Sequence, residues 1–156
     1  DGMEDEIDTV LDAIGADSRV GKKYLKFGYG FGGPCLPRDN RAFAAYAKSL
    51  GVEYNLGTTT DNFNDTHNQF LLDLLICKNH ENRPFYFDYV AYKKGTDILT
   101  ESQQFKLCKS LLEQGYTVYI NDNETILNRV RDTLYEQYYD RVKFGEPKEE
   151  VFKVEI

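Results

Sequence analysis

The sequence has 156 residues and a formal net charge of −7, and aromatic residues, 12 Tyr and 10 Phe, make up 14% of it. This is too much apolar and aromatic surface for a disordered chain, so we expect a globular protein. No lysine- or arginine-rich stripe interrupts the acidic balance, which argues against nucleic-acid binding. A few local donors would still be enough to bind a phosphorylated metabolite.

The three cysteines, at positions 35, 77 and 108, include no C-x-x-C pair. This usage argues against a disulfide framework and against a cysteine zinc site, and it favours a reducing, cytoplasmic location. His67 has no second histidine at i+4, so we expect no metal site. No apolar run approaches 18 residues, so we expect no membrane insertion. The chain begins with Asp1 rather than Met, which suggests a piece of a longer protein.

The first half of the sequence has the periodicity of helices. Apolar residues predict one helix over residues 3–14, before Gly15, and another from about Asp39 to residue 50, before Gly51. A third helix is predicted over 61–78, with Asp61 as its cap. Its expected buried side chains are Phe63, Phe70, Leu71, Leu74 and Leu75. Cys77 and Cys108 follow apolar neighbours and are expected in the core.

From residue 79 onward the pattern changes to alternating strands and helices. The aromatic and β-branched run 85–92 predicts a strand, after a polar stretch that ends in proline. The elements expected after it are a helix over 101–114, a strand over 116–120, a helix over 124–139 and short strands at 141–144 and 151–156. This order is typical of a parallel α/β layer. We therefore expect an α/β fold in which a helical domain, residues 1–80, precedes a small Rossmann-like parallel α/β domain, residues 81–156.

The loop of residues 28–39 reads GYGFGGPCLPRD and contains the pattern G-x-G-x-x-G. A dinucleotide-binding fingerprint would need an apolar strand before the first glycine and a helix at the third. The lysine-rich residues 22–27 make a poor buried strand, and Pro34 and Pro37 delay a helix. The alternative interpretation is a glycine hinge that presents a thiol.

Cys35 lies between the two prolines of this loop, which stiffen the backbone that carries it. A helix that begins near Asp39 would direct its positive end toward the sulfur, and Arg38 and Arg41 would add positive charge. These influences favour the thiolate, which is the nucleophilic form of cysteine. The alternatives are that Cys35 is a small buried hydrophobe and that Asp39 is only a helix cap. The residues alone leave both questions open.

Residues 30–39, GFGGPCLPRD, resemble the active-cysteine motif of the UDP-glucose/GDP-mannose dehydrogenases, G-F-G-G-[SP]-C-[FLI]-x-[KR]-D. Residues 14–21 and 24–26 are similar to the segment that precedes this motif in the family. A looser similarity links residues 91–102 to the family's G-L-[AT]-[FY]-K-x-x-T-D-D-x-R-E-S, at the start of its C-terminal domain. Residues 118–122 resemble its V-x-x-Y-D-P strand end.

The resemblance implies a fold and a reaction. In that family an N-terminal Rossmann domain binds NAD, a long central helix forms the dimer, and a C-terminal α/β domain holds the nucleotide. The expected function is that of an NAD-dependent nucleotide-sugar 6-dehydrogenase of polysaccharide biosynthesis. The first choice of reaction is the oxidation of UDP-glucose to UDP-glucuronate, and the second choice of substrate is an N-acetylated UDP-sugar or GDP-mannose. The expected assembly is a homodimer through the helical half.

In the family's reaction the cysteine attacks an aldehyde that a first hydride transfer has formed. A second transfer gives a thioester, and water then releases a uronic acid. Carried over by position, Cys35 is the nucleophile and Asp39 organises water and proton transfer. The resemblance assigns substrate contacts to Arg19, Tyr24, Leu25, Lys26, Gly32, Gly33 and Lys93.

Two of these assignments have ordinary alternatives, since Arg19 and Lys93 would also be unremarkable as exposed surface charges. Arg19 would reach substrate across the dimer interface. Thr100 and Ile98 depart from the family's C-terminal motif, and residues 124–156 do not visibly supply its later strand. The NAD domain and two central-helix residues would precede Asp1, so we expect the chain alone to be inactive. The alternative function is a noncatalytic dimerising or UDP-sugar-binding module.

Overall fold

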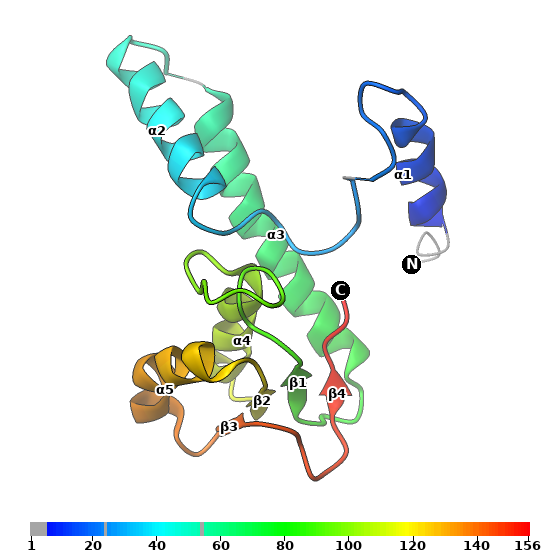
Figure 1. Ribbon diagram of the computed structural model, residues 1–156, viewed down its shortest axis with the longest axis vertical. Helices are drawn as coiled ribbons and strands as arrows, with labels where there is room; N and C mark the ends of the chain where they lie inside the picture. The colour runs from blue at the N-terminus through cyan, green and yellow to red at the C-terminus, as the bar shows by residue number, and fades with distance from the viewer. Residues whose placement is uncertain (1–5, 24, 54) are drawn as a thin grey trace.

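The computed structural model describes residues 6–23, 25–53 and 55–156 (Figure 1). The helices in these ranges are α1 (Ile7–Gly15), α2 (Leu36–Ser49), α3 (Leu56–Lys78), α4 (Gln103–Glu113) and α5 (Glu124–Tyr138). The strands are β1 (Phe85–Phe87), β2 (Val118–Ile120), β3 (Val142–Phe144) and β4 (Phe152–Lys153). The predicted fold class, helices followed by a small parallel α/β unit, is confirmed.

The four strands form one parallel sheet in the order β3-β2-β1-β4. Phe85 of β1 lies opposite Val118 of β2 on one side and Phe152 of β4 on the other. The chain therefore builds β2 and β3 outward from β1 and then returns to the other edge of β1 for β4. Both short strands expected after residue 140 are present, and β4 completes the sheet.

One helix joins the two halves of the molecule. In α3 a buried stripe runs at helical spacing through Gly57, Asn64, Asn68, Leu71 and Leu75. Gly57 lies against α2, where a Cβ would approach the Asn40 carbonyl oxygen to 2.8 Å, whereas Leu71 and Leu75 belong to the core of the sheet. Of the two carboxamide residues between them, Asn64 donates to the Phe31 carbonyl oxygen in the loop that carries Cys35, and Asn68 donates to the Gln103 carbonyl oxygen at the start of α4.

The prediction of buried aromatic side chains on α3 is wrong. Phe63 is 70% exposed and Phe70 is 51% exposed, because both lie off the buried stripe. Leu71 and Leu75 are buried as predicted, and Leu74 is half-buried. Cys108 is buried in the core as expected, but Cys77 is exposed, which corrects the expectation that both are core residues.

Two predicted helix starts are also wrong. The helix α2 begins at Leu36, with Cys35 at its N-cap and Pro37 in the first turn. Proline is tolerated there because the first turn has no intrahelical partner for its missing N–H. The helix α3 begins at Leu56, where the Asn55 side chain accepts a hydrogen bond from the Thr58 amide at 3.0 Å, so Asp61 is not the cap.

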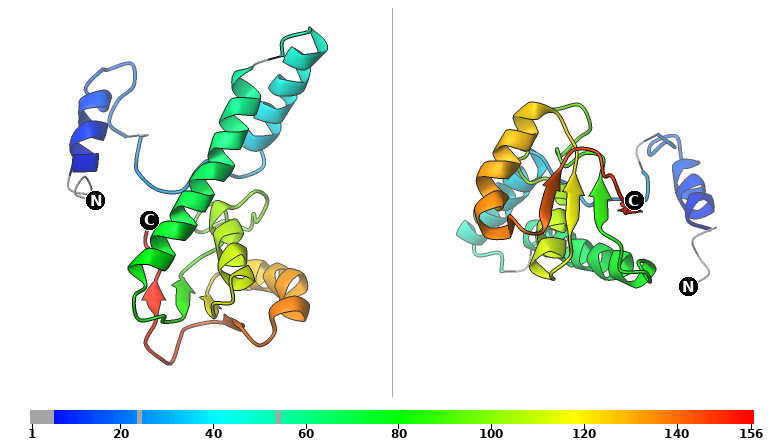
Figure 2. Two further views of the ribbon diagram at one scale, coloured as in Figure 1. Left: turned by 180° about the vertical axis from the view of Figure 1, so that it is seen from behind. Right: turned by 90° about the horizontal axis from the view of Figure 1, so that it is seen from below.

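The helices α2 and α3 form an antiparallel pair that extends away from the sheet, and α1 stands on the opposite side of α3 from α2 (Figures 1 and 2). Within the described part of the chain, no helix combines the length and the apolar character that crossing a membrane would need.

Candidate functional site

The loop that leads to Cys35 is fixed to α3 by two side-chain hydrogen bonds. The Asn64 side-chain amide donates to the Phe31 carbonyl oxygen at 2.9 Å, and His67 Nε2 lies 2.8 Å from the Gly28 carbonyl oxygen. A carbonyl oxygen only accepts, so we assign the imidazole proton to Nε2. His67 thus anchors the loop.

Three glycines of the loop fit where no other residue would. A Cβ on Gly30 would lie 2.0 Å from Asn64 Oδ1, and one on Gly32 would lie 2.4 Å from the Glu101 carbonyl oxygen. Gly33 has a left-handed backbone, with φ +82°, and a Cβ there would lie 2.7 Å from the Tyr92 ring. The backbone of this loop therefore packs closely against α3 and against loops of the α/β half.

These contacts decide between the two interpretations of the G-x-G-x-x-G pattern. Among residues 6–23 and 25–27 no strand precedes Gly28, and α2 begins at Leu36, after the third glycine rather than at it. The space beside the glycines is already filled by protein atoms. The pattern is therefore a packed hinge and not a dinucleotide cradle.

Cys35 is exposed at the N-cap of α2, and its side chain makes no capping hydrogen bond. The interpretation of Cys35 as a buried hydrophobe is therefore wrong. The thiol stands at the positive end of the 14-residue helix α2. Cys108 is the contrasting case, because complete burial raises the pKa of its thiol far above the ordinary value.

Asp39 lies in the first turn of α2 and is exposed. Its backbone amide donates to the Cys35 carbonyl oxygen at 2.9 Å, and its carboxylate accepts from Arg38 Nε at 2.8 Å. The pKa of Arg38 is raised, first by this hydrogen bond and more weakly by the charge of Cys35. Asp39 and Arg38 thus share the exposed first turn that follows the thiol.

Arg41 does not supply the free positive charge that the sequence suggested. Its guanidinium donates to Asp61 Oδ2 at 3.0 Å and to Glu101 Oε1 at 2.7 Å, and these bonds raise its pKa. Lys106 lies 2.9 Å from the second oxygen of Glu101. Glu101 therefore holds cations from α2 and α4 together, and these two cations lower its pKa from 4.5 to about 2.

The loop after β1 carries Lys93, which is exposed. Asp122, after β2, accepts from the amides of Val90 and Ala91 at 2.9 Å each, and Ser102 Oγ donates to the Val90 carbonyl oxygen at 2.6 Å. These bonds fix the start of the loop. Tyr92, next to Lys93, packs on Gly33, so the structure brings the Lys93 loop against the cysteine loop.

The other predicted substrate contacts lie elsewhere. Leu25 and Lys26 line a pocket of about 490 Å³ together with residues of α1 such as Asp8 and Asp12. Arg19 is exposed and forms a bidentate pair with Asp17, just after α1. Tyr24 lies outside the described residues. The chain by itself therefore does not gather Arg19, Leu25 and Lys26 around Cys35.

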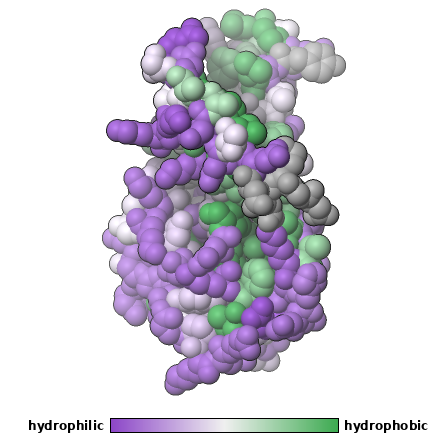
Figure 3. Space-filling model, turned by 90° about the vertical axis from the view of Figure 1, so that its right-hand side faces the viewer, coloured by the Kyte–Doolittle hydropathy of each residue, from purple (hydrophilic) through white to green (hydrophobic). Residues whose placement is uncertain are grey.

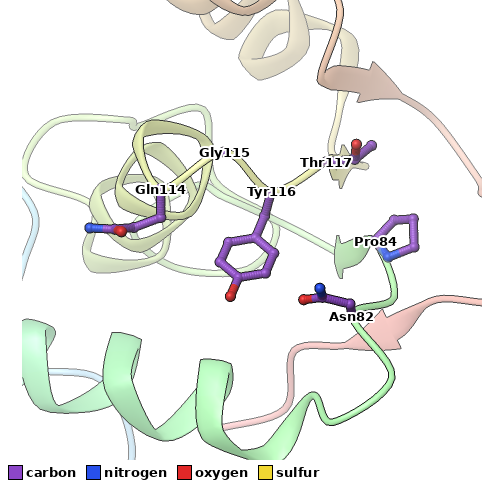
Figure 4. A pocket seen from close by; sticks show the side chains of 6 residues that line it. All are labelled: Asn82, Pro84, Gln114, Gly115, Tyr116 and Thr117. Carbon is purple, nitrogen blue, oxygen red and sulfur yellow. The ribbon is translucent and has the colours of Figure 1, made fainter.

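Other pockets are open on the surface of the described residues, and three of them lie beside the sheet or α3. One, of about 210 Å³, lies at the carboxyl ends of β1 and β4 and is lined by Tyr29, Asp88 and Ile156 among others. A second, of about 370 Å³, lies at the amino ends of β1 and β2, where Asn82 and Tyr116 turn toward the same opening (Figure 4). The third is an apolar groove of about 440 Å³ between α1, α3 and β4, on the face seen in Figure 3. None of these pockets is lined by Cys35.

Among residues 6–23, 25–53 and 55–156, no three His, Cys, Asp or Glu side chains lie close enough together to hold a metal ion.

Sequence reasoning missed the residues that support the site, namely Asn64, His67, Tyr92, Glu101 and Asp122. A signal for Asn64 is present in the sequence, because Asn64 and Asn68 continue the helical stripe of Leu71 and Leu75. Polar residues on the buried face of a helix indicate a polar partner. The role of Glu101 depends on contacts across 60 residues of sequence, which no local pattern contains.

The sequence of this chain is similar to those of nucleotide-sugar dehydrogenases. The sequence model of the UDP-glucose/GDP-mannose dehydrogenase family, central domain, matches residues 1–66. UDP-glucose 6-dehydrogenase AglM of Haloferax volcanii is 36% identical over 110 residues, which are 70% of this chain and 26% of that protein. GDP-mannose 6-dehydrogenase of Pseudomonas aeruginosa is 30% identical over 138 residues, covering 80% of this chain and 31% of that protein.

A solved structure agrees with the sequence comparisons. The UDP-glucose dehydrogenase of Pyrobaculum islandicum superposes with a TM-score of 0.73 at 29% identity, covering 90% of this chain and 32% of that chain. The chain thus spans only 26 to 32% of the length of these three proteins.

Proposed function

Because the chain belongs to the UDP-glucose/GDP-mannose dehydrogenase family, we propose that it supplies the cysteine and part of the sugar-nucleotide site of an NAD-dependent nucleotide-sugar 6-dehydrogenase. UDP-glucose is the proposed substrate, and UDP-glucuronate the product. The observation that carries the proposal is the position of Cys35, exposed at the N-cap of α2 and at the end of a loop packed against both halves of the chain.

The proposed role of Cys35 follows from the chemistry of aldehydes. The thiolate attacks the aldehyde carbon, so a C–S bond forms and the carbonyl oxygen becomes an oxyanion. This tetrahedral thiohemiacetal can give up a hydride, which the aldehyde itself gives up poorly; NAD bound by the proposed enzyme would accept the hydride, and the thiohemiacetal becomes a thioester. Water then attacks the thioester carbon, the C–S bond breaks, and a carboxylate and the thiol are released. The positive end of α2 lies where the sulfur carries negative charge.

Asp39 is the proposed group for water and proton transfer in the last step. It is exposed in the turn after Cys35, where a carboxylate can accept a proton from the attacking water. Its hydrogen bond with Arg38 orients the carboxylate on this turn. Lys93 is the proposed contact for the negative charge of the sugar nucleotide, because its loop packs on the cysteine loop through Tyr92.

NAD does not fit the described residues of this chain. The glycines that could have cradled its pyrophosphate are packed against Asn64, Glu101 and Tyr92. We therefore assign NAD binding to a separate domain. The division into a helical domain, residues 1–80, and an α/β domain, residues 81–156, remains a prediction of the same proposal.

A homodimer through the helical half is also part of the proposal. The helices α2 and α3 expose large apolar side chains to solvent, among them Phe43, Tyr46, Leu50, Leu56 and Phe63. Apolar surface of this extent is typical of an interface. In a dimer, Arg19 and the Leu25–Lys26 segment of one copy could belong to the site of the other, which would account for their distance from Cys35 in one chain.

The test is alkylation of the 156-residue chain by iodoacetamide, with the modified cysteine identified by peptide mass spectrometry. UDP-glucose should slow the alkylation of Cys35 and leave that of Cys77 unchanged, since Cys77 is exposed at the far end of α3. GDP-mannose and an N-acetylated UDP-sugar, tested at the same concentrations, rank the substrate classes.

Protection by GDP-mannose alone would reassign the substrate. Binding of UDP-glucose in calorimetry, together with a Cys35 that alkylates no faster than Cys77, would favour the noncatalytic binding module instead. The absence of both binding and protection would contradict the proposal that this chain holds part of the nucleotide-sugar site.

A further inference from the structure

Glu101 has an unusual backbone. With φ at 52° it is one of two non-glycine residues in the left-handed region within the described part of the chain, the other being Asn82. This conformation is unfavourable for a residue with a long side chain, and asparagine tolerates it better than glutamate does. Such strain persists only where the surrounding structure imposes it, and it is frequent near functional groups.

The backbone of Glu101 contacts the loop on the N-terminal side of Cys35. Its carbonyl oxygen lies so close to Gly32 that a Cβ there would approach it to 2.4 Å. The carbonyl also faces Gln103 Nε2 at 3.4 Å. The left-handed turn at Glu101 thus presents this carbonyl to the glycine hinge, and only glycine at position 32 leaves room for it.

The side chain of Glu101 contacts the helix on the C-terminal side of Cys35. Its Oε1 accepts from Arg41 of α2 at 2.7 Å, and its Oε2 lies 2.9 Å from Lys106 of α4. Arg41 is bound a second time by Asp61 of α3, and Lys106 lies 3.6 Å from Asp65 of the same helix. The Glu101 side chain is only 24% exposed, so this network is shielded more than an ordinary surface pair.

One residue therefore contacts the chain on both sides of the thiol, through its carbonyl at Gly32 and through its carboxylate at Arg41. We propose that Glu101 is a positioning residue for Cys35, which fixes the glycine hinge and α2 relative to each other so that the thiol stays at the N-terminus of the helix. The proposal rests on the proposed role of Cys35, and it adds the α/β half of the chain as the part that holds the thiol in place.

The test measures the rate of Cys35 alkylation by iodoacetamide against pH in the 156-residue chain, for the wild type and for Glu101→Gln. The variant keeps the length of the side chain and its backbone but removes the charge that holds Arg41. The rate for Cys35 near neutral pH should fall about two- to fivefold, and its dependence on pH should differ from that of the wild type, because the glycine hinge and α2 no longer hold the thiol in one orientation. The rate for Cys77 should not change.

The matched control is Asp65→Asn, which removes the other acidic partner of Lys106 and leaves the contact between Glu101 and Arg41 intact. General loosening of the fold would instead make buried Cys108 react, and it would affect all cysteines. If Glu101→Gln fails to fold, Arg41→Gln breaks the same contact from the other side and should give the same result for Cys35.

A Cys35 profile in Glu101→Gln and Arg41→Gln that matches the wild type, with Cys108 still protected, would overturn the proposal. This outcome is independent of the nucleotide experiment. The proposed function fails if no nucleotide sugar binds or protects Cys35. The proposed role of Glu101 fails only if substitution of Glu101 leaves the alkylation rate of Cys35 unchanged.

Discussion

Asn64 donates a hydrogen bond from its side-chain amide to the carbonyl oxygen of Phe31, and this bond crosses from the middle of α3 to the loop that ends at Cys35. The oxygen of the same carboxamide occupies the space where Gly30 would carry a Cβ. The packing of the loop and the exposure of the thiol are therefore linked through one buried polar residue.

Asn64→Ala should lower the free energy of unfolding by about 1–3 kcal/mol, because the Phe31 carbonyl loses its partner in a site that α3 shields. Urea denaturation of the chain measures this difference. Asn62→Ala, on the exposed side of the same helix, is the control and should change stability by less than about 0.5 kcal/mol. Equal effects of the two substitutions would show that the bond to Phe31 contributes nothing.

Gly33→Ala and Gly95→Ala form a matched pair, because both glycines have similar left-handed backbones, with φ of +82° and +80°. A Cβ on Gly95 would have no atom within 4 Å, so Gly95→Ala should lower the free energy of unfolding only by the cost of placing alanine in a left-handed backbone, about 1–2 kcal/mol. Gly33→Ala should cost about 1–3 kcal/mol more, since its Cβ meets the Tyr92 ring.

Urea denaturation of the two glycine variants gives the comparison. Tyr92→Ala in the Gly33→Ala background should recover part of the extra cost, because it removes the ring that the new Cβ meets. If Gly33→Ala lowers the free energy of unfolding no more than Gly95→Ala does, the contact between the Lys93 loop and the cysteine loop is not tight.

The sequence predicted the order of the elements and the place of the cysteine loop, but not what holds the loop. Helical periodicity and the aromatic, β-branched run 85–92 are local signals that locate the elements, although the strand β1 covers only Phe85–Phe87 of the predicted run. The start of α3 was misplaced because Asp61 and Asn55 are both good caps, and only tertiary structure selects Asn55. The exposure of Phe63 could not be foreseen, because apolar spacing alone does not show which of two neighbouring faces of α3 is buried.

Asp122→Ala should destabilise the chain by about 1–3 kcal/mol, because it leaves the amides of Val90 and Ala91 without their acceptor. Asp132→Ala, on the exposed side of α5, is the control. Urea denaturation measures both. Amide hydrogen exchange over residues 88–93 should also be faster in Asp122→Ala than in the wild type, and it should not change in Asp132→Ala. An unchanged exchange rate in that segment of Asp122→Ala would contradict the role of Asp122 in fixing the Lys93 loop.

Stability should depend on the ionisation of Glu101 at acidic pH. Arg41 first and Lys106 second lower its pKa from 4.5 to about 2, so the folded state binds a proton less readily than the unfolded state does. The stabilisation is therefore complete above about pH 4.5 and is lost as the pH falls through 2. The unfolding free energies of the wild type and Glu101→Gln should converge as the pH is lowered from 5 to 2. A difference that stays constant over this interval would mean that Glu101 is not held as a carboxylate.

The most direct test of the central claim compares two exposed thiols of the same chain at opposite ends of helices. Cys35 is the N-cap residue of α2, whereas Cys77 lies in the last turn of α3, so the two exposed sulfurs stand at opposite ends of helix dipoles. With limiting iodoacetamide at neutral pH, Cys35 should be alkylated about tenfold faster than Cys77. Equal rates, or a faster Cys77, would contradict the account of Cys35 as an activated nucleophile.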